Sequence, residues 1–142
     1  MNETKREYNS QAYRNPPTAV DILLEYNGGI VLVKRKNFPY GWALPGGFQE
    51  YGESLEQTGI REGKEETGLD VKILHQLSAR SEPDRDPRTH VNSVAFIAKG
   101  YGTLKAGDDA KEVMIASIDE MPELVFDHIE RIKEYREWRE KN

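Results

Sequence analysis

Apolar and polar residues alternate along the chain in blocks that predict several β-strands. The runs from Thr18 to Tyr26 and from Ile30 to Arg35 are mainly apolar, and Asn27-Gly28-Gly29 separates them. Because Asn-Gly steps favour the tight turns that join antiparallel strands, we expect a β-hairpin here. Three further strands are expected over residues 71–79, 91–101 and 112–118, with polar loops at 81–90 and 105–111.

Two other segments carry signals typical of helices. Ser54 followed by Gln57 forms a capping box, and Gly68 is suited to end the helix that this box begins. A second helix is expected from Asp127 onward, with Asp127 and Glu130 as its capping pair. The apolar stripe of this second helix, which we expect to pack on the core, consists of Ile129, Ile132, Tyr135 or the stem of Arg136, and Trp138.

Strands that lie before, between and after two separated helices imply a mixed sheet covered on both faces. The expected fold class is therefore α/β, an α/β/α sandwich with a mixed central β-sheet. The length of 142 residues fits one domain with a sizeable core. Residues 1–13 are polar and charged, and we expect them to form a flexible or edge-packing arm.

Composition restricts the classes of function. With 37% hydrophobic and 32% charged residues and no apolar run near the length of a membrane helix, neither a membrane partner nor export is expected. The chain has no cysteine, which fits a reducing cytoplasm. A formal net charge of -5 argues against a protein that coats nucleic acid.

An acidic segment between residues 61 and 66 is the main candidate for chemistry. Glu62, Glu65 and Glu66 have helical spacings of three and four, so their carboxylates project from one face. Like charges so close together repel each other, and a bound Mg²⁺ or Mn²⁺ is the simplest compensation. The alternative is a solvated acidic face on which Arg61 pairs with Glu65.

The loop before this helix is rich in aromatic residues and glycine. Gly46 and Gly47 follow Pro45, and their bare backbone could approach a phosphate or offer a carbonyl oxygen to a metal. A simple turn is the alternative interpretation. Phe38 and Trp42 lie close by and could stack on a base, although for Trp42 we favour a place in the core.

The loop and helix together resemble the Nudix box of the Nudix hydrolases. The matching positions are Gly47, Glu53, Arg61, Glu62, Glu65, Glu66, Gly68 and Leu69. The resemblance implies the α/β/α sandwich of the family and metal-dependent hydrolysis of a phosphoanhydride. It also implies that Arg61 holds the carboxylates, that Glu53 is an auxiliary ligand, and that Gly46, Glu62, Glu65 and Glu66 bind metal. The chain departs from the pattern at Gly63, where the family has an aliphatic residue, and Gly59 replaces a common alanine; we expect these glycines to pack closely on a sheet.

Further motifs resemble the short ADP-ribose pyrophosphatases of bacteria and archaea. They are NPPTAVDILLE, RKNFPYGWALPGGF, SEPDRDPRTH, LKAGDDAKEV and FDH, with a departure at Ile115 and Ala116. This resemblance implies a small-molecule nucleotide substrate, ADP-ribose, that is split into AMP and ribose 5-phosphate. The candidate substrate-binding residues are Arg35, Phe38, Gly47, Arg85, Asp86, Arg88 and His90, of which the arginines suit bidentate contacts to phosphate.

A late carboxylate completes the predicted site. Asp108, Asp109 and Glu112 are the candidates, and we favour Glu112 as catalytic base and metal ligand, because it resembles the late glutamate of many Nudix hydrolases. Alternatively, all three keep a surface turn soluble. Two other functions stay open, a nucleoside triphosphate or dinucleoside polyphosphate pyrophosphohydrolase and a non-catalytic nucleotide-sensing domain, and a homodimer is an open expectation.

Overall fold

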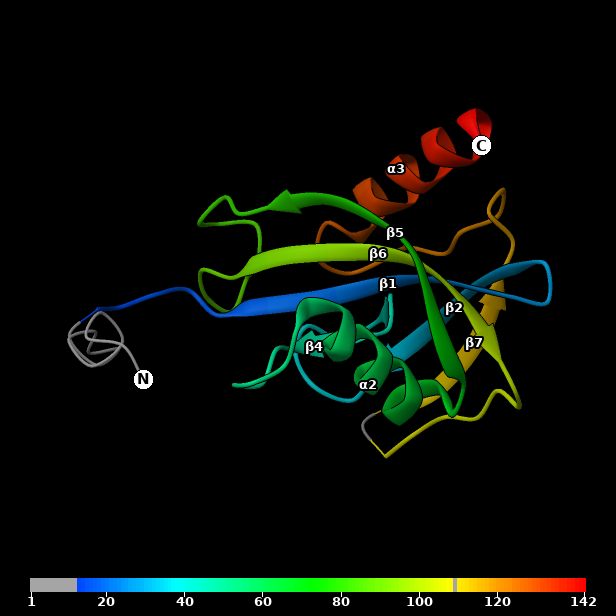
Figure 1. The fold of residues 1–142 in the computed structure, drawn as a ribbon, viewed down its shortest axis with the longest axis horizontal. Coiled ribbons are helices and arrows are strands. Elements are labelled where there is room, and N and C mark those ends of the chain that lie inside the picture. Colours follow the sequence, from blue (N-terminus) through cyan, green and yellow to red (C-terminus); the bar gives the residue numbers. More distant parts are fainter. Residues whose placement is uncertain (1–12, 109) are drawn as a thin grey trace.

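A computed structural model of the chain describes residues 13–108 and 110–142. Residues 1–12 of the predicted arm, and the candidate acid Asp109, therefore lie outside the described residues. The elements in chain order are β1 (Thr18–Tyr26), β2 (Gly29–Arg35), β3 (Trp42–Ala43), β4 (Gly46–Phe48), α2 (Leu55–Thr67), β5 (Asp70–Arg80), β6 (Asn92–Tyr101), β7 (Ala110–Ala116) and α3 (His128–Lys141) (Figure 1). Among the described residues, no helix is long and apolar enough to cross a membrane.

The sheet is mixed, as predicted, and β1 lies at its centre. β1 runs parallel to β6 and antiparallel to β2 and β4, while β5 pairs with β6 and β7 with β2. The β1–β2 hairpin is confirmed. Its turn places Asn27 at φ 48 and Gly28 at φ 81, the positive values that a two-residue turn of this kind requires.

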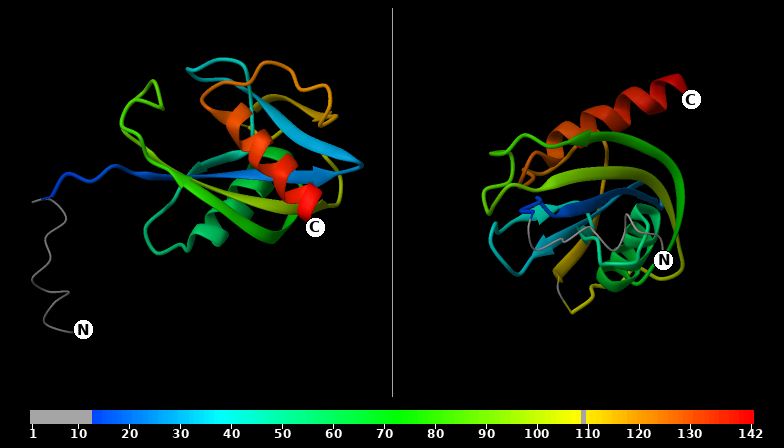
Figure 2. Two further views of the ribbon diagram at one scale, coloured as in Figure 1. Left: turned by 90° about the horizontal axis from the view of Figure 1, so that it is seen from above. Right: turned by 60° about the vertical axis from the view of Figure 1, so that its left-hand side comes forward.

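Helices α2 and α3 cover opposite faces of the sheet (Figures 1 and 2). Because side chains alternate along a strand, Val20, Ile22 and Leu24 of β1 belong to one buried cluster, while Leu23 belongs to the other. The first cluster includes Leu55 of α2, and the second includes Ile132 and Tyr135 of α3. The predicted α/β/α sandwich is thereby confirmed.

Helix α2 begins and ends as its sequence predicts. The Ser54 hydroxyl accepts a hydrogen bond from the Gln57 backbone, and the Gln57 side chain accepts one from the Ser54 backbone. Gly68 ends the helix at φ 74. Gly59 and Gly63 are buried and face Ile22 and other side chains of the sheet, so the prediction that they pack on it is confirmed.

The start of α3 differs from the prediction. Asp127 makes no capping bond with its side chain, because its carboxylate accepts hydrogen bonds from both Nε and Nη2 of Arg85. Glu130 instead pairs with Lys133. Ile129 is 43% exposed, so the prediction that it belongs to the packed apolar stripe of this helix is wrong.

The aromatic- and glycine-rich loop predicted before α2 also contains more structure than expected. β3 pairs with β2 and β4 pairs with β1, so the loop returns to the sheet twice. Trp42 packs against the cluster beneath α3, and Leu44 is buried within it, which favours the core interpretation of Trp42. Leu44 and Gly46 also contact the start of α3 and α2, because their backbone nitrogens donate to His128 and Glu66 respectively.

Candidate active site

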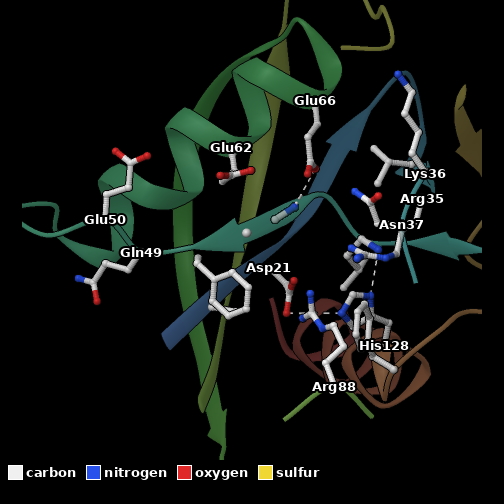
Figure 3. Close-up of a pocket in the computed structure, with 17 residues that line it drawn as sticks. Asp21, Arg35, Lys36, Asn37, Gln49, Glu50, Glu62, Glu66, Arg88 and His128 are labelled. Carbon is white, nitrogen blue, oxygen red and sulfur yellow. Dashed lines mark hydrogen bonds and ion pairs between the residues drawn. The ribbon is translucent and has the colours of Figure 1, made fainter. Parts of the chain in front are cut away.

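An open cavity of about 450 Å³ lies between the acidic face of α2, the loop around β4 and the start of α3 (Figure 3). It is lined by Ala19, Asp21, Val33, Arg35, Lys36, Asn37, Leu44, Gly46, Gly47, Phe48, Gln49, Glu50, Glu62, Glu66, Arg88, Phe126 and His128. Carboxylates line the side formed by α2, and arginines line the opposite side. The cavity therefore offers both acidic metal ligands and cations for an anionic substrate.

The α2 face brings two of the three predicted glutamates into the cavity. Glu62 and Glu66 line it, whereas Glu65 does not, and the Glu65 side chain is 52% exposed. Glu62 rests directly on Gly47, because a Cβ added there would come within 2.5 Å of the Glu62 carboxyl carbon. Only glycine at position 47 lets the loop and the carboxylate approach so closely.

Arg61 organises the carboxylates around it. Its guanidinium donates to Glu53 from Nε at 2.6 Å and from Nη2 at 3.0 Å, and its Nη1 lies 2.6 Å from Glu62 and 3.3 Å from Glu65. These hydrogen bonds hold the pKa of Glu53 down at about 2. Arg61 also donates to the Phe48 carbonyl, so it ties α2 to the loop.

Glu66 is half-buried on the side of α2 that faces the loop. It accepts a hydrogen bond from the Gly46 backbone nitrogen at 3.0 Å. Burial raises the pKa of Glu66 to about 8. The negative charges of Glu62 and Asp21 raise this pKa further, while the hydrogen bond from Gly46 and the positive charge of Arg35 oppose the rise. Such a concentration of negative charge fits a divalent cation.

The donor set also fits Mg²⁺ or Mn²⁺, because carboxylate and carbonyl oxygens are the ligands that these hard cations prefer. Within residues 13–108 and 110–142, no three acidic or histidine side chains already stand in a metal-binding arrangement. Glu62 and Glu65 instead contact Arg61, while Glu66 contacts Gly46. Glu62 and Glu66 would hold the metal within the cavity.

Two arginines and two aromatic rings form the opposite wall. The Arg88 guanidinium lies 5.2 Å from the centre of the Phe48 ring and 5.0 Å from that of Phe126, and Arg35 lies 5.1 Å from Phe126. Buried Asp86 orients Arg88 through Nε and Nη2. Burial and the neighbouring charge of Arg88 lower the pKa of Arg35. The rings thus hold two like charges close together, as a binding site for adjacent phosphates requires.

Other predicted substrate contacts lie outside the cavity lining. Arg85 binds Asp127 and the Val91 carbonyl, and so links the 81–90 loop to α3. Phe38 is exposed beside Tyr40, and His90 contacts the Ser81 carbonyl. The contact of these three residues with substrate stays a prediction.

Glu112 is exposed on β7, opposite Lys34 of β2, and does not line the cavity. The loop before it lies close to the site, because the Gly107 backbone donates to the Glu66 carbonyl and Lys36 contacts the Asp108 carbonyl. The role of Glu112 as base and metal ligand stays a prediction.

The sequence analysis assigned no site role to several cavity residues, among them Asp21, Phe48, Phe126 and His128. Asp21 interrupts the apolar run of β1, and a buried charge in such a run is a usable signal. Burial would raise the pKa of Asp21, but His128, Arg131 and Ser93 lower it below its usual value. Phe126 and His128 belong to the FDH motif, but that motif alone does not place them at the cavity, since only the fold brings the start of α3 to the loop.

A loop-helix unit with half-buried carboxylates, facing a wall of arginines on a mixed sheet sandwiched by helices, defines a metal-dependent site for phosphoanhydrides. The family model of the NUDIX domain matches residues 15–138. The chain therefore belongs to the Nudix family.

Relatives and solved structures within this family are similar over much of the chain. The chain is 49% identical over 130 residues to the ADP-ribose pyrophosphatase of Methanocaldococcus jannaschii. This alignment covers 89% of this chain and 77% of that protein. It is 33% identical over 100 residues to the ADPR responsive transcriptional repressor NtrR of Acinetobacter baylyi, covering 65% of this chain and 40% of the repressor. The crystallised NUDIX domain of Shewanella oneidensis NrtR, complexed with ADP ribose, superposes with a TM-score of 0.80 at 29% identity, covering 96% of this chain and 98% of that domain.

Proposed function

We propose that the chain hydrolyses ADP-ribose to AMP and ribose 5-phosphate with the help of Mg²⁺ or Mn²⁺. The observation that carries the proposal is the placement of half-buried Glu62 and Glu66 across one cavity from Arg35 and Arg88. The similarity to the M. jannaschii ADP-ribose pyrophosphatase supports this choice of substrate. In the reaction, one P–O bond of the anhydride breaks, water supplies an oxygen to one phosphorus, and the other phosphate leaves with the bridging oxygen.

The residues of the chain divide this work. Arg35 and Arg88 would bind the phosphate oxygens. Asp86 and Phe48 contact Arg88, and the Phe126 ring contacts both guanidinium groups. Arg61 would keep the carboxylates of Glu53 and Glu62 in place through its hydrogen bonds to them. A divalent metal bound by Glu62 and Glu66 would supply charge neutralisation and lower the pKa of the attacking water. Glu112 remains our proposal for the base, and the loop before it contacts α2 through the hydrogen bond from the Gly107 backbone to the Glu66 carbonyl.

The resemblance to the NrtR domain supports a second candidate, an ADP-ribose sensor without turnover. The enzyme is favoured because the chain keeps all four acidic residues of the Nudix box, namely Glu53, Glu62, Glu65 and Glu66. Arg61 contacts the first three of them, as a role in orienting the carboxylates requires. The choice can be made by experiment, because a sensor binds ADP-ribose but releases no AMP.

The test is a phosphatase-coupled phosphate-release panel over ADP-ribose, NADH, dinucleoside polyphosphates and 8-oxo-dGTP, with Mg²⁺, Mn²⁺ or excess EDTA. We expect ADP-ribose to give the highest kcat/KM and EDTA to abolish turnover. A preparation of Glu66→Gln, purified in the same way, controls for contaminating hydrolases. Full activity in EDTA, or preference for a nucleoside triphosphate, would contradict the proposal.

Cytoplasmic location and assembly into a homodimer are further proposals. The absence of cysteine is compatible with a reducing compartment. Light scattering on the purified chain would measure its oligomeric state.

A further inference from the structure

His128 is a buried residue of the cavity for which the hydrolytic function provides no role so far. It is the first residue of α3, only 2% exposed, and its ring lines the cavity. Nδ1 lies 3.0 Å from the backbone nitrogen of Leu44, and Nε2 lies 3.5 Å from Oδ2 of Asp21 (Figure 3). Both ring nitrogens therefore face a polar partner.

These partners determine where the proton of the ring lies. A backbone N–H can only donate, so Nδ1 must be the unprotonated acceptor for Leu44. The proton of the neutral ring then lies on Nε2 and points toward the Asp21 carboxylate. Because both nitrogens are occupied in this way, the ring is suited to orienting its neighbours rather than to exchanging protons with substrate.

The contact with Leu44 is the first of three that fix successive residues of the loop. The Pro45 carbonyl accepts a hydrogen bond from the Ile22 backbone at 2.9 Å, and the Gly46 backbone donates to Glu66 at 3.0 Å. His128 thus acts on the same short segment whose other end touches a proposed metal ligand.

Asp21 reinforces the arrangement from the other side. A Cβ added to Gly46 would lie 2.6 Å from Oδ1 of Asp21, so this carboxylate packs directly against the loop. The Ser93 hydroxyl donates to Asp21 at 3.2 Å, and Arg131 of α3 donates to the Ser93 carbonyl. The start of α3 therefore holds the loop both through His128 and through Asp21.

We propose that His128 is a positioning residue: by accepting the Leu44 N–H it holds Leu44-Pro45-Gly46 in the position from which Gly46 and Glu66 bind the metal. The inference rests on the proposed metal-dependent function. A histidine that merely fills the core would act through its volume and not through Nδ1.

Three substitutions separate these two roles. His128→Asn keeps an acceptor near the position of Nδ1 but is too short to reach Asp21. His128→Gln places its amide near the position of Nε2 but offers nothing to Leu44, and His128→Leu removes both contacts while keeping apolar volume. Ile129→Ala is the matched control, because Ile129 is the next residue of the same helix and is 43% exposed.

Binding of Mn²⁺ to the folded protein, followed by electron paramagnetic resonance without substrate, is the readout, with thermal unfolding as the check on folding. We expect His128→Gln and His128→Leu to weaken Mn²⁺ binding about 10- to 100-fold, as loss of an outer-shell partner does elsewhere. His128→Asn and Ile129→Ala should stay within about threefold of the wild type, well below that loss.

Several results would overturn the inference. Unchanged Mn²⁺ affinity in folded His128→Gln shows that the Leu44 contact does not position the site. If His128→Asn and His128→Gln weaken Mn²⁺ binding equally, the effect comes from the lost ring volume and not from Nδ1. The comparison of these two variants distinguishes the two roles even if His128→Leu does not fold. A wild-type protein that binds no Mn²⁺ would instead refute the metal-dependent function itself, and the inference with it.

Discussion

Substitution of Gly63 by alanine tests how closely α2 is seated on the sheet. A Cβ at position 63 would lie 2.7 Å from Cγ2 of Val71 and 2.9 Å from Cδ1 of Ile22. Favourable contacts between carbon atoms lie at about 3.5–4.0 Å, so the helix or Val71 must move. Val71 and Ile22 therefore fill the space that the aliphatic residue of other Nudix boxes would need.

The magnitude follows from two opposing effects. Alanine in a helix interior is favoured over glycine by about 1 kcal/mol. Overpacking a close-packed core costs about 1–3 kcal/mol. The free energy of unfolding of Gly63→Ala should therefore fall by about 1 kcal/mol, taking the middle of that range.

Gly59→Ala is the matched control one turn earlier on the same face. Its added Cβ would lie 3.2 Å from Ile22 and 3.4 Å from Val20, distances that a small shift of these side chains relieves. The preference of the helix for alanine over glycine should then exceed the packing cost, and we expect Gly59→Ala to stabilise the fold by about 0.5 kcal/mol.

Urea unfolding followed by circular dichroism measures both changes, and the thermal midpoint of Gly63→Ala should fall by about 3 °C. Val71→Ala removes the closest atom, so adding Gly63→Ala in that background should be neutral or stabilising. The coupling between the two substitutions should reach about 1 kcal/mol. If Gly63→Ala stabilises the wild-type fold as much as Gly59→Ala does, the packing argument is refuted.

Three further predictions concern activity. Glu66→Gln should lower kcat about a hundredfold or more at saturating Mg²⁺, because the variant loses a proposed metal ligand, and wild-type turnover would contradict this. Arg88→Ala should mainly raise KM for ADP-ribose, because an anion clamp binds ground and transition states alike; a fall in kcat at unchanged KM would assign Arg88 to the transition state. Glu112→Gln should lower kcat by about 10² to 10⁴ with folding retained if it is the base, whereas normal turnover beside an impaired Asp108→Asn would move that role to Asp108.

Features encoded locally could be predicted from the sequence. The hairpin rests on the Asn27-Gly28 turn, and α2 rests on a capping box that is complete within four residues. The acidic face of α2 follows from helical spacing alone. β3 and β4 escaped prediction because strands of two and three residues carry no periodicity.

Features that depend on distant contacts could not be predicted. Asp127 has the sequence of a cap, but Arg85, 42 residues earlier, binds its carboxylate more favourably through two hydrogen bonds. The contact of His128 with Leu44 spans 84 residues. Neither residue shows its role until β6 and α3 have been placed on the sheet.

The distribution of charge in the cavity explains why metal and nucleotide belong together in this site. Glu62 and Glu66 come from α2, while Arg35 and Arg88 come from β2 and the 81–90 loop. A diphosphate that reaches the arginines also faces the two carboxylates, and these like charges repel one another. A divalent cation held by Glu62 and Glu66 would offset that repulsion, because it would supply positive charge facing the phosphates. Each ligand thus lowers the free-energy cost of binding the other, and this coupling is reciprocal.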